Sequence, residues 1–158
     1  MDADFDDFYR GEAPALLRLC YLATLNREAA ADATQEAMAR AWRHWADISE
    51  PSPRAWVRTV ALNLCRSRWR RIARDARLVP RMYVVEARAD ALPEPELYAA
   101  MRRLPARQRE AIALFYFADL SIAECARTMS LSEGAVKSHL ARGRERLGAD
   151  AGLKEDLV

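Results

Sequence analysis

Residues 121–147 read S-I-A-E-C-A-R-T-M-S-L-S-E-G-A-V-K-S-H-L-A-R-G-R-E-R-L. This segment predicts two helices joined by a short turn. Ser121 and Glu124 have the spacing of a capping box, which predicts the start of a helix. Ser132 is placed to cap a second helix after a turn of only three residues. A short helix, a tight turn and a second helix with exposed cations form the helix-turn-helix pattern, whose second helix enters the major groove of DNA.

The second helix of this pattern carries polar residues suited to DNA. Lys137, Ser138 and Arg142 are spaced to reach base edges, whereas Arg144 and Arg146 lie further along the helix and suit phosphates. The alternative interpretation is a small helical bundle with a basic surface. That alternative is favoured only if Lys137 and Arg142 pack internally.

The rest of the sequence also favours helices. Alanine and arginine are frequent, β-branched residues are sparse, and only five glycines and seven prolines interrupt the chain. Apolar residues recur at helical spacing from Phe5, with a kink or break expected at Gly11 and Pro14. Further helices are expected over 27–45, from Pro53 onwards, and over 96–104 and 106–118.

These elements predict an all-α fold. Periodicity fails after residue 77, where prolines and acidic residues appear, and this favours a tether. We therefore expect two small helical domains, 1–78 and 96–148, a flexible linker over 79–95 and a tail over 149–158.

The composition excludes several classes of protein. No run reaches the roughly 18 apolar residues of a membrane span, and the first residues are acidic where a secretory signal is basic, so we expect no membrane insertion and a cytoplasmic location. His44 and His139 fall in different predicted domains, the three cysteines are far apart, and no glycine-rich phosphate loop is present. We therefore expect no catalytic residues, no metal and no cofactor, and cysteines that are reduced and buried.

Basic residues are concentrated in two segments. Residues 54–81 carry nine arginines and one acidic residue, and residues 102–148 carry nine basic and five acidic residues. Residues 1–53, by contrast, carry ten acidic and five basic residues. Such clusters favour polyanion partners, although a charge run is more often a solvated helix face.

The first basic segment interleaves arginine with an aromatic residue, Trp69. Cations beside flat faces are what a groove for single-stranded or distorted nucleic acid needs. The alternative is that Trp69 belongs to the core and the arginines solvate a helix end. The other three tryptophans, Trp42, Trp45 and Trp56, are expected in the core.

Four motifs, in order, resemble bacterial extracytoplasmic-function (ECF) sigma factors. Residues 32–43, D-A-T-Q-E-A-M-A-R-A-W-R, resemble the D-x-x-Q-E…A-W-R helix of that family. Residues 56–63, W-V-R-T-V-A-L-N, look like its W-L-x-x-I-A-x-N segment, and residues 104–110, L-P-A-R-Q-R-E, resemble its L-P-x-x-x-R-E motif. Residues 134–147 are similar to its G-T-V-K-S-x-x-x-R-A-R-x-x-L recognition helix, so the resemblance spans roughly residues 5–147.

The resemblance implies a two-domain initiation factor that binds core RNA polymerase and promoter DNA and performs no reaction of its own. The positions that match the family's docking site on the polymerase β′ coiled coil are Asp32, Gln35, Glu36 and Arg40. The β flap of the polymerase is a second expected contact. In this family an anti-sigma factor commonly covers the polymerase and DNA faces, so such a partner is expected too.

The resemblance also assigns the two promoter elements. Asn63 falls where the family reads a base flipped out of the −10 element, beside an arginine-rich helix that contributes Arg66, Arg68, Trp69, Arg70 and Arg71. The recognition helix reads the −35 element through Lys137, Ser138 and Arg142, with Arg144 and Arg146 as further DNA contacts. A stand-alone LuxR-type regulator is the alternative, because residues 132–140 also resemble its recognition helix.

Overall fold

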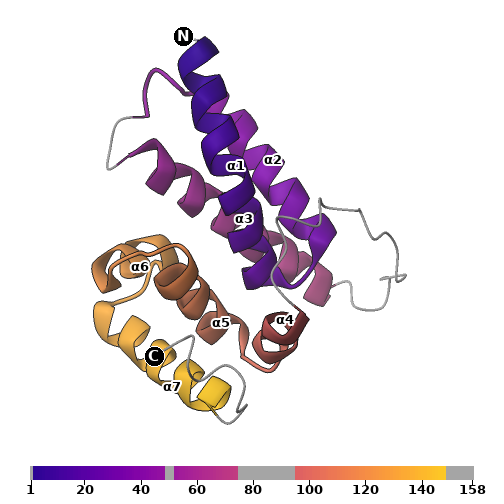
Figure 1. Cartoon of the computed structure of the whole chain (residues 1–158), viewed down its shortest axis with the longest axis vertical. Helices are drawn as coiled ribbons and strands as arrows, with labels where there is room; N and C mark the ends of the chain where they lie inside the picture. The colour runs from indigo at the N-terminus through magenta and orange to yellow at the C-terminus, as the bar shows by residue number, and fades with distance from the viewer. Residues whose placement is uncertain (1, 49–51, 75–94, 149–158) are drawn as a thin grey trace. The chain divides into compact units, whose positions relative to one another are not determined.

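The computed structural model describes residues 2–48, 52–74 and 95–148, with only the backbone described for Asp2 and for 68–74. Every regular element in these ranges is a helix, so the all-α expectation is confirmed (Figure 1). The chain divides into two compact units, Met1–Leu92 and Pro93–Val158.

The expected linker and tail lie outside this description. Of residues 79–95 only Pro95 is described, as the first residue of a helix, and none of 149–158 is. The expected domain boundaries stay predictions.

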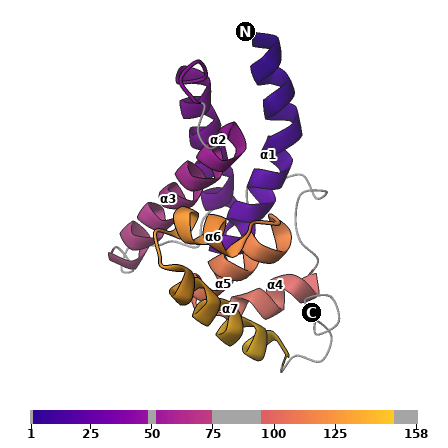
Figure 2. The same cartoon turned by 90° about the vertical axis from the view of Figure 1, so that its left-hand side faces the viewer.

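The described part of unit 1 is a bundle of three helices, α1 (Asp2–Thr24), α2 (Arg27–Arg43) and α3 (Pro53–Arg74). Each helix contacts the other two (Figures 1 and 2). The core consists of small and aliphatic side chains from all three helices: Leu16, Leu19, Cys20, Leu22, Ala30, Ala37, Met38, Ala41, Val57, Ala61 and Leu62. Alanines dominate the contribution of α2, which allows its backbone to approach its neighbours closely.

Helix α1 continues through Gly11 and Pro14, so the chain does not break there, and the alternative expectation of a kink stays a prediction. Proline removes one helical hydrogen bond and normally costs about 3 kcal/mol inside a helix. Leu16, Leu19 and Cys20 follow directly and are buried, and burial of such side chains contributes roughly 1.5–3 kcal/mol each. Packing of this face against α2 and α3 therefore outweighs the local penalty.

Two polar caps fix the starts of α2 and α3. The side-chain oxygen of Asn26 accepts a hydrogen bond from the Ala29 N–H at 2.9 Å, and the Ser52 hydroxyl accepts one from the Ala55 N–H at 3.1 Å. Leu25 adopts a left-handed conformation, with φ of 54°, and this permits the two-residue turn between α1 and α2. Each cap satisfies a backbone N–H that the first turn of a helix leaves without a partner inside the helix.

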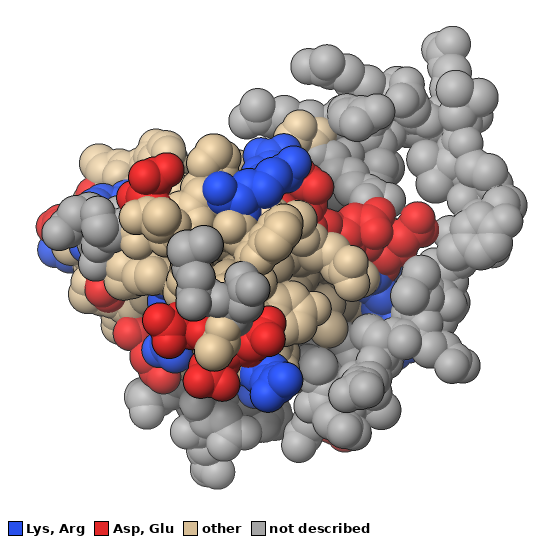
Figure 3. All heavy atoms as spheres, turned by 90° about the horizontal axis from the view of Figure 1, so that it is seen from above, with Lys and Arg blue, Asp and Glu red and all other residues tan. Residues whose placement is uncertain are grey.

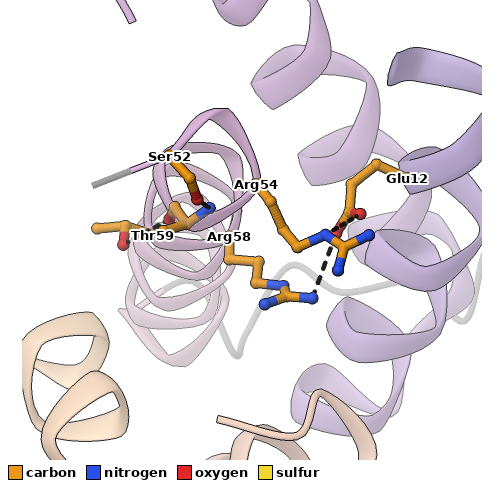
Figure 4. A network of polar contacts seen from close by, with 6 residues as sticks. Glu12, Ser52, Arg54, Arg58 and Thr59 are labelled. Atoms are coloured by element: carbon orange, nitrogen blue, oxygen red, sulfur yellow. Dashed lines mark hydrogen bonds and ion pairs between the residues drawn. The ribbon is translucent and has the colours of Figure 1, made fainter. Parts of the chain in front are cut away.

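A buried carboxylate ties α1 to the first turns of α3 (Figure 4). Glu12 is only 3% exposed, and its Oε2 accepts a hydrogen bond from Arg54 Nε at 2.7 Å. Arg58 Nη2 lies 3.5 Å from Glu12 Oε1, and the Arg58 side chain is 11% exposed. Because Asn63 lies on the same helix, this ion-pair cluster also fixes the position of the predicted −10 residue relative to α1.

Glu12→Ala is expected to lower the free energy of unfolding of unit 1 by about 2 kcal/mol, because it removes the carboxylate that compensates two guanidinium groups. All four tryptophans lie within residues 42–69, so tryptophan fluorescence during urea unfolding reports on unit 1. Asp6→Ala, which removes an exposed carboxylate of α1, is the matched control. Equal midpoints for Glu12→Ala and Asp6→Ala would contradict a stabilising role for the cluster.

Unit 2 contains α4 (Pro95–Arg102), α5 (Ala106–Ile112), the π-helical segment η2 (Ala113–Phe117), α6 (Ile122–Met129) and α7 (Glu133–Gly148). The expected helix 106–118 is thus present, but its last turn is π-helical. The Ala118 N–H donates to the Ala113 carbonyl at 3.1 Å, five residues back. Helix α7 packs against α5 and α6.

The helix-turn-helix geometry follows from local chemistry. Ser121 and Glu124 form the predicted capping box of α6, and Ser130 ends that helix in a left-handed conformation, with φ of 55°. The Ser132 hydroxyl then accepts a hydrogen bond from the Ala135 N–H at 3.1 Å. These contacts set the angle at which α7 leaves α6.

Gly143 permits close approach of α7 to α5. A Cβ atom at this position would lie 3.0 Å from Cγ1 of Ile112 and 3.7 Å from Cβ of Gln108. Both neighbours are buried, so neither side chain has room to move away. Glycine therefore seats the central turn of α7 directly on the core of unit 2.

Candidate nucleic-acid and partner interfaces

Helix α7 has one buried and one exposed face. Its buried residues are Val136, Leu140, Gly143 and Leu147, whereas the predicted DNA-binding residues are all exposed: Lys137, Ser138, Arg142, Arg144 and Arg146. At about 100° per residue, Ser138 lies opposite the buried stripe, with Lys137 on one side and Arg142 on the other. The alternative that Lys137 and Arg142 pack internally is therefore wrong.

Arg144 and Arg146 occupy opposite flanks of α7. Residues that are two positions apart in the sequence point about 200° apart around a helix. Arg144 and Arg146 therefore lie on either side of the row formed by Lys137, Ser138 and Arg142. Arg144 Nη1 donates a hydrogen bond to the hydroxyl of Tyr116, in η2, at 3.1 Å. Cations on both flanks match a helix that lies between two phosphate backbones.

His139 lies at the edge of the buried face of α7 and is half-buried. Burial lowers its pKa below the usual value, and the positive charges of Arg107 on α5 and Arg142 on α7 lower this pKa further. The folded protein therefore favours the neutral imidazole more strongly than the unfolded chain does.

The stability of unit 2 is expected to fall as the pH drops through the usual histidine range near 6.5, because the unfolded chain then binds a proton that folded His139 resists. The loss should stop below the lowered pKa of His139. Hydrogen exchange of the α7 amides, corrected for intrinsic rates, measures this between pH 7.5 and 5. His139→Gln should reduce the dependence, and an unchanged dependence in that variant would assign it to other groups.

The exposed face of α2 carries the second group of predicted residues. Asp32, Gln35 and Arg40 are exposed and Glu36 is half-buried. Arg40 Nε donates to Glu36 Oε1 at 2.7 Å, and this hydrogen bond, with the charges of Arg40 and Arg43, lowers the pKa of Glu36. Since exposed ion pairs add little stability, these groups keep their capacity for a partner.

Trp42 is on this same face, and the expectation that it belongs to the core is wrong. It is 60% exposed and follows Gln35 by seven residues, which places the two side chains on one stripe of α2. Trp45 instead packs against Phe5 and Phe8, with ring centroids 5.3 and 5.0 Å away. The position of Trp42 on the helical stripe of Gln35, rather than its residue type, was the signal for exposure.

The predicted −10 residues lie on α3, and the structure describes only part of them. Asn63 is exposed, and Arg66, one turn later, is half-buried. The side chains of Arg68, Trp69, Arg70 and Arg71 lie outside the described residues. The choice between an aromatic-arginine groove and a solvated helix end therefore stays open.

Acidic residues of the N-terminal segment 1–53 lie at the surface of unit 1. Asp4, Asp6 and Asp7 are exposed on the first turns of α1. Figure 3 shows acidic side chains in several groups on the face it presents, beside basic ones. The acidic excess of residues 1–53 is therefore partly a surface property.

Within residues 2–48, 52–74 and 95–148, no three His, Cys, Asp or Glu side chains are grouped to hold a metal ion. None of the helices described is both long and apolar enough to cross a membrane. The three cysteines are buried and form no disulfide bond, as expected, and burial raises the pKa of Cys125 to about 11.

Both units match known protein families. Residues 8–75 match sigma-70 region 2, and residues 95–147 match sigma-70 region 4. The ECF RNA polymerase sigma factor SigM of Mycobacterium tuberculosis is 34% identical over 146 residues, which cover 90% of this chain and 74% of that relative. The chain belongs to the ECF sigma factor family.

This ECF sigma factor directs RNA polymerase to promoters for transcription initiation, and it is not an enzyme. It binds core RNA polymerase and promoter DNA. The RNA polymerase sigma-E factor of Streptomyces coelicolor is 29% identical over 161 residues, covering 98% of this chain and 86% of the relative. A stand-alone LuxR-type regulator is excluded, because the region 2 match occupies the first unit.

Solved structures agree with the fold of this sigma factor. The sigma factor RpoE of Bartonella quintana, crystallised with the anti-sigma factor NepR, superposes with a TM-score of 0.75 at 25% identity and covers 91% of this chain. That alignment covers 94% of the Bartonella chain. CnrH, solved in complex with the cytosolic domain of CnrY, has a TM-score of 0.68 at 24% identity, over 96% of this chain and 91% of its own.

Proposed function

We propose that this sigma factor divides promoter recognition between its units. Unit 1, within 1–78, docks on core polymerase through α2 and holds the −10 element at α3, whereas the helix-turn-helix unit, within 96–148, reads the −35 element. The observation that carries the proposal is the exposed row of Lys137, Ser138 and Arg142 over a fully buried opposite face of α7.

The polymerase contact is assigned to the exposed face of α2. Asp32, Gln35, Glu36 and Arg40 offer charged and amide groups, and Trp42 adds a large exposed aromatic surface to the same face. Protein interfaces commonly combine a central aromatic anchor with a polar rim. The expected occupant is the β′ coiled coil of the polymerase.

The −10 contact is assigned to α3. The amide of Asn63 can both donate and accept, as the edge of an unstacked base requires. Opening a duplex costs about 1.4 kcal/mol per stacking step, and a base held in a pocket offsets part of that cost. The arginines at 66, 68, 70 and 71 are expected to hold the backbone of the opened strand beside it.

An anti-sigma factor is the proposed regulatory partner. The similar sigma factor RpoE of Bartonella quintana was crystallised with the anti-sigma factor NepR, and this supports the proposal. A protein that covers the α2 face or the exposed row of α7 would block polymerase or DNA. Because the polymerase acts in the cytoplasm, we assign this sigma factor to that compartment.

Arg142→Ala is expected to weaken holoenzyme binding at a preferred −35 sequence by about 1–3 kcal/mol and to relax selection at the base it reads. Arg146→Ala, which removes a flanking cation, should weaken binding similarly on all sequences. Affinities for a set of duplexes that vary one −35 base pair at a time separate the two outcomes. If both variants lost affinity equally for all of the duplexes, Arg142 would be a phosphate contact. That result would contradict recognition of the −35 bases by α7.

A further inference from the structure

The contact between Tyr116 and Arg144 joins two segments that are 28 residues apart in the sequence. Arg144 is exposed, Tyr116 is half-buried, and Nη1 of Arg144 donates to the Tyr116 hydroxyl at 3.1 Å. A hydrogen bond at the surface adds little to stability, so this contact is not needed to hold the fold. Its effect is to restrict the direction in which the Arg144 guanidinium points.

The π-helical turn brings Tyr116 to this position. A π turn contains an extra residue relative to an α turn, so it re-aims the side chains that follow its start, and such turns are frequent at functional sites. Ile112 and Ala113, four and three residues before Tyr116, are buried in the core, whereas Tyr116 reaches the surface beside α7. Phe115 packs edge-on against the Tyr116 ring, with centroids 5.0 Å apart, and so restricts its orientation.

The Tyr116–Arg144 pair retains donors for an anion. The Tyr116 hydroxyl accepts the bond from Arg144, so its own proton is available to donate. The guanidinium of Arg144 keeps four further N–H groups and its positive charge. A tyrosine O–H and a guanidinium held side by side match a phosphate group, which accepts several charge-assisted hydrogen bonds.

The start of α6 is a poorer phosphate site. Helix N-termini attract phosphates through their first N–H groups and their partial positive charge. Here the carboxylate of Glu124 lies at that end, with its Oε2 accepting from the Ser121 N–H at 2.7 Å. The negative charge opposes a second anion there, so on this flank of the helix-turn-helix the Tyr116–Arg144 pair is the better anchor.

We infer that Tyr116 and Arg144 together bind one backbone phosphate of promoter DNA at the −35 element, with Tyr116 acting both as a donor and as the positioning residue for Arg144. The inference rests on the proposed function, because it places α7 in the major groove. It adds a residue outside the recognition helix to the DNA contacts. It also gives the π turn a role in fixing the register of α7 on the duplex.

The test uses holoenzyme assembled from core polymerase and the full-length sigma factor. Affinities are measured for −35 duplexes that carry a single neutral methylphosphonate at each backbone position in turn. Neutralising one particular phosphate, on the strand beside η2, should lower the affinity of the wild type about tenfold. Tyr116→Phe should bind the unmodified duplex about three- to tenfold more weakly, and neutralising that one phosphate should then cost almost nothing.

Three further variants complete the design. In Arg144→Ala, neutralising the same phosphate should no longer lower the affinity. The slope of log affinity against log salt should also fall in magnitude by about 1. The double variant should match Arg144→Ala within about twofold, because both residues bind the same group. Tyr9→Phe, on α1 of unit 1, removes a hydroxyl elsewhere and should leave the phosphate profile unchanged.

Two results would overturn the inference: wild-type affinity and profile in Tyr116→Phe, or a loss in that variant spread evenly over all phosphates. Arg142→Ala separates these failures from failure of the proposed function. If Arg142→Ala relaxes −35 selection while Tyr116→Phe changes nothing, only the phosphate site is wrong. If Arg142→Ala also leaves −35 selection unchanged, α7 does not read the element.

Discussion

Trp42→Ala is expected to weaken binding of this sigma factor to core RNA polymerase by about 3 kcal/mol, or roughly 100-fold. Trp42 is 60% exposed in the free protein, on the same stripe of α2 as Gln35. Large aromatic side chains of this kind dominate binding energy when a partner covers them, because they bury much apolar area with little loss of side-chain freedom. Truncation of an exposed side chain should leave the core of unit 1 intact.

Competition between labelled wild type and unlabelled variants for core polymerase measures this loss. Tyr9→Ala is the matched control, since Tyr9 is 41% exposed on α1 and lies outside the proposed docking face. Asp32→Ala combined with Glu36→Ala should also lower the affinity while unit 2 stays folded. Wild-type affinity for both the Trp42 variant and the double variant would place the polymerase contact elsewhere.

Asn63→Ala is expected to make the free energy of open-complex formation on duplex promoters less favourable by about 3 kcal/mol. The affinity for the −35 half of the promoter should stay unchanged. The reason is chemical: only the side-chain amide offers a donor and an acceptor to an unstacked base, and alanine offers neither. Asn63 is exposed on α3, so its truncation should not disturb packing.

Two DNA substrates separate reading of the −10 base from binding of the rest of the promoter. On fork templates with an already unpaired −10 base, the wild type should discriminate between bases, and Asn63→Ala should lose this discrimination. Ser67→Ala, which truncates an exposed polar side chain one turn further along α3, should keep it. If Asn63→Ala weakens −35 duplex binding as strongly as opening, Asn63 has a structural role instead.

Features that depend on neighbouring residues were predictable from the sequence. The capping box at Ser121 and Glu124 and the cap at Ser132 involve residues three positions apart, and they define both helices of the helix-turn-helix. The exposure of Lys137 and Arg142 followed from helical periodicity. Such local rules were enough to predict the fold class and the exposed face of α7 that we propose meets DNA.

Features that depend on distant packing were not predictable. A break at Pro14 was one of two expected outcomes and ignored burial of the residues that follow it, and Trp42 was assigned to the core by residue type rather than by position on the helix. Glu12 and Arg54 are 42 residues apart, and Tyr116 meets Arg144 through a π turn that the apolar pattern of 113–117 does not reveal. Contacts of this kind are decided by tertiary structure.

Run-off transcription with purified core RNA polymerase and a library of duplex promoters measures which promoters this sigma factor selects. We expect initiation only when this sigma factor is added, and only from promoters that share one −35 and one −10 sequence. Arg142→Ala and Asn63→Ala should then change selection at the −35 and −10 elements respectively. Polymerase binding without initiation, or DNA binding that does not require polymerase for selectivity, would contradict the account.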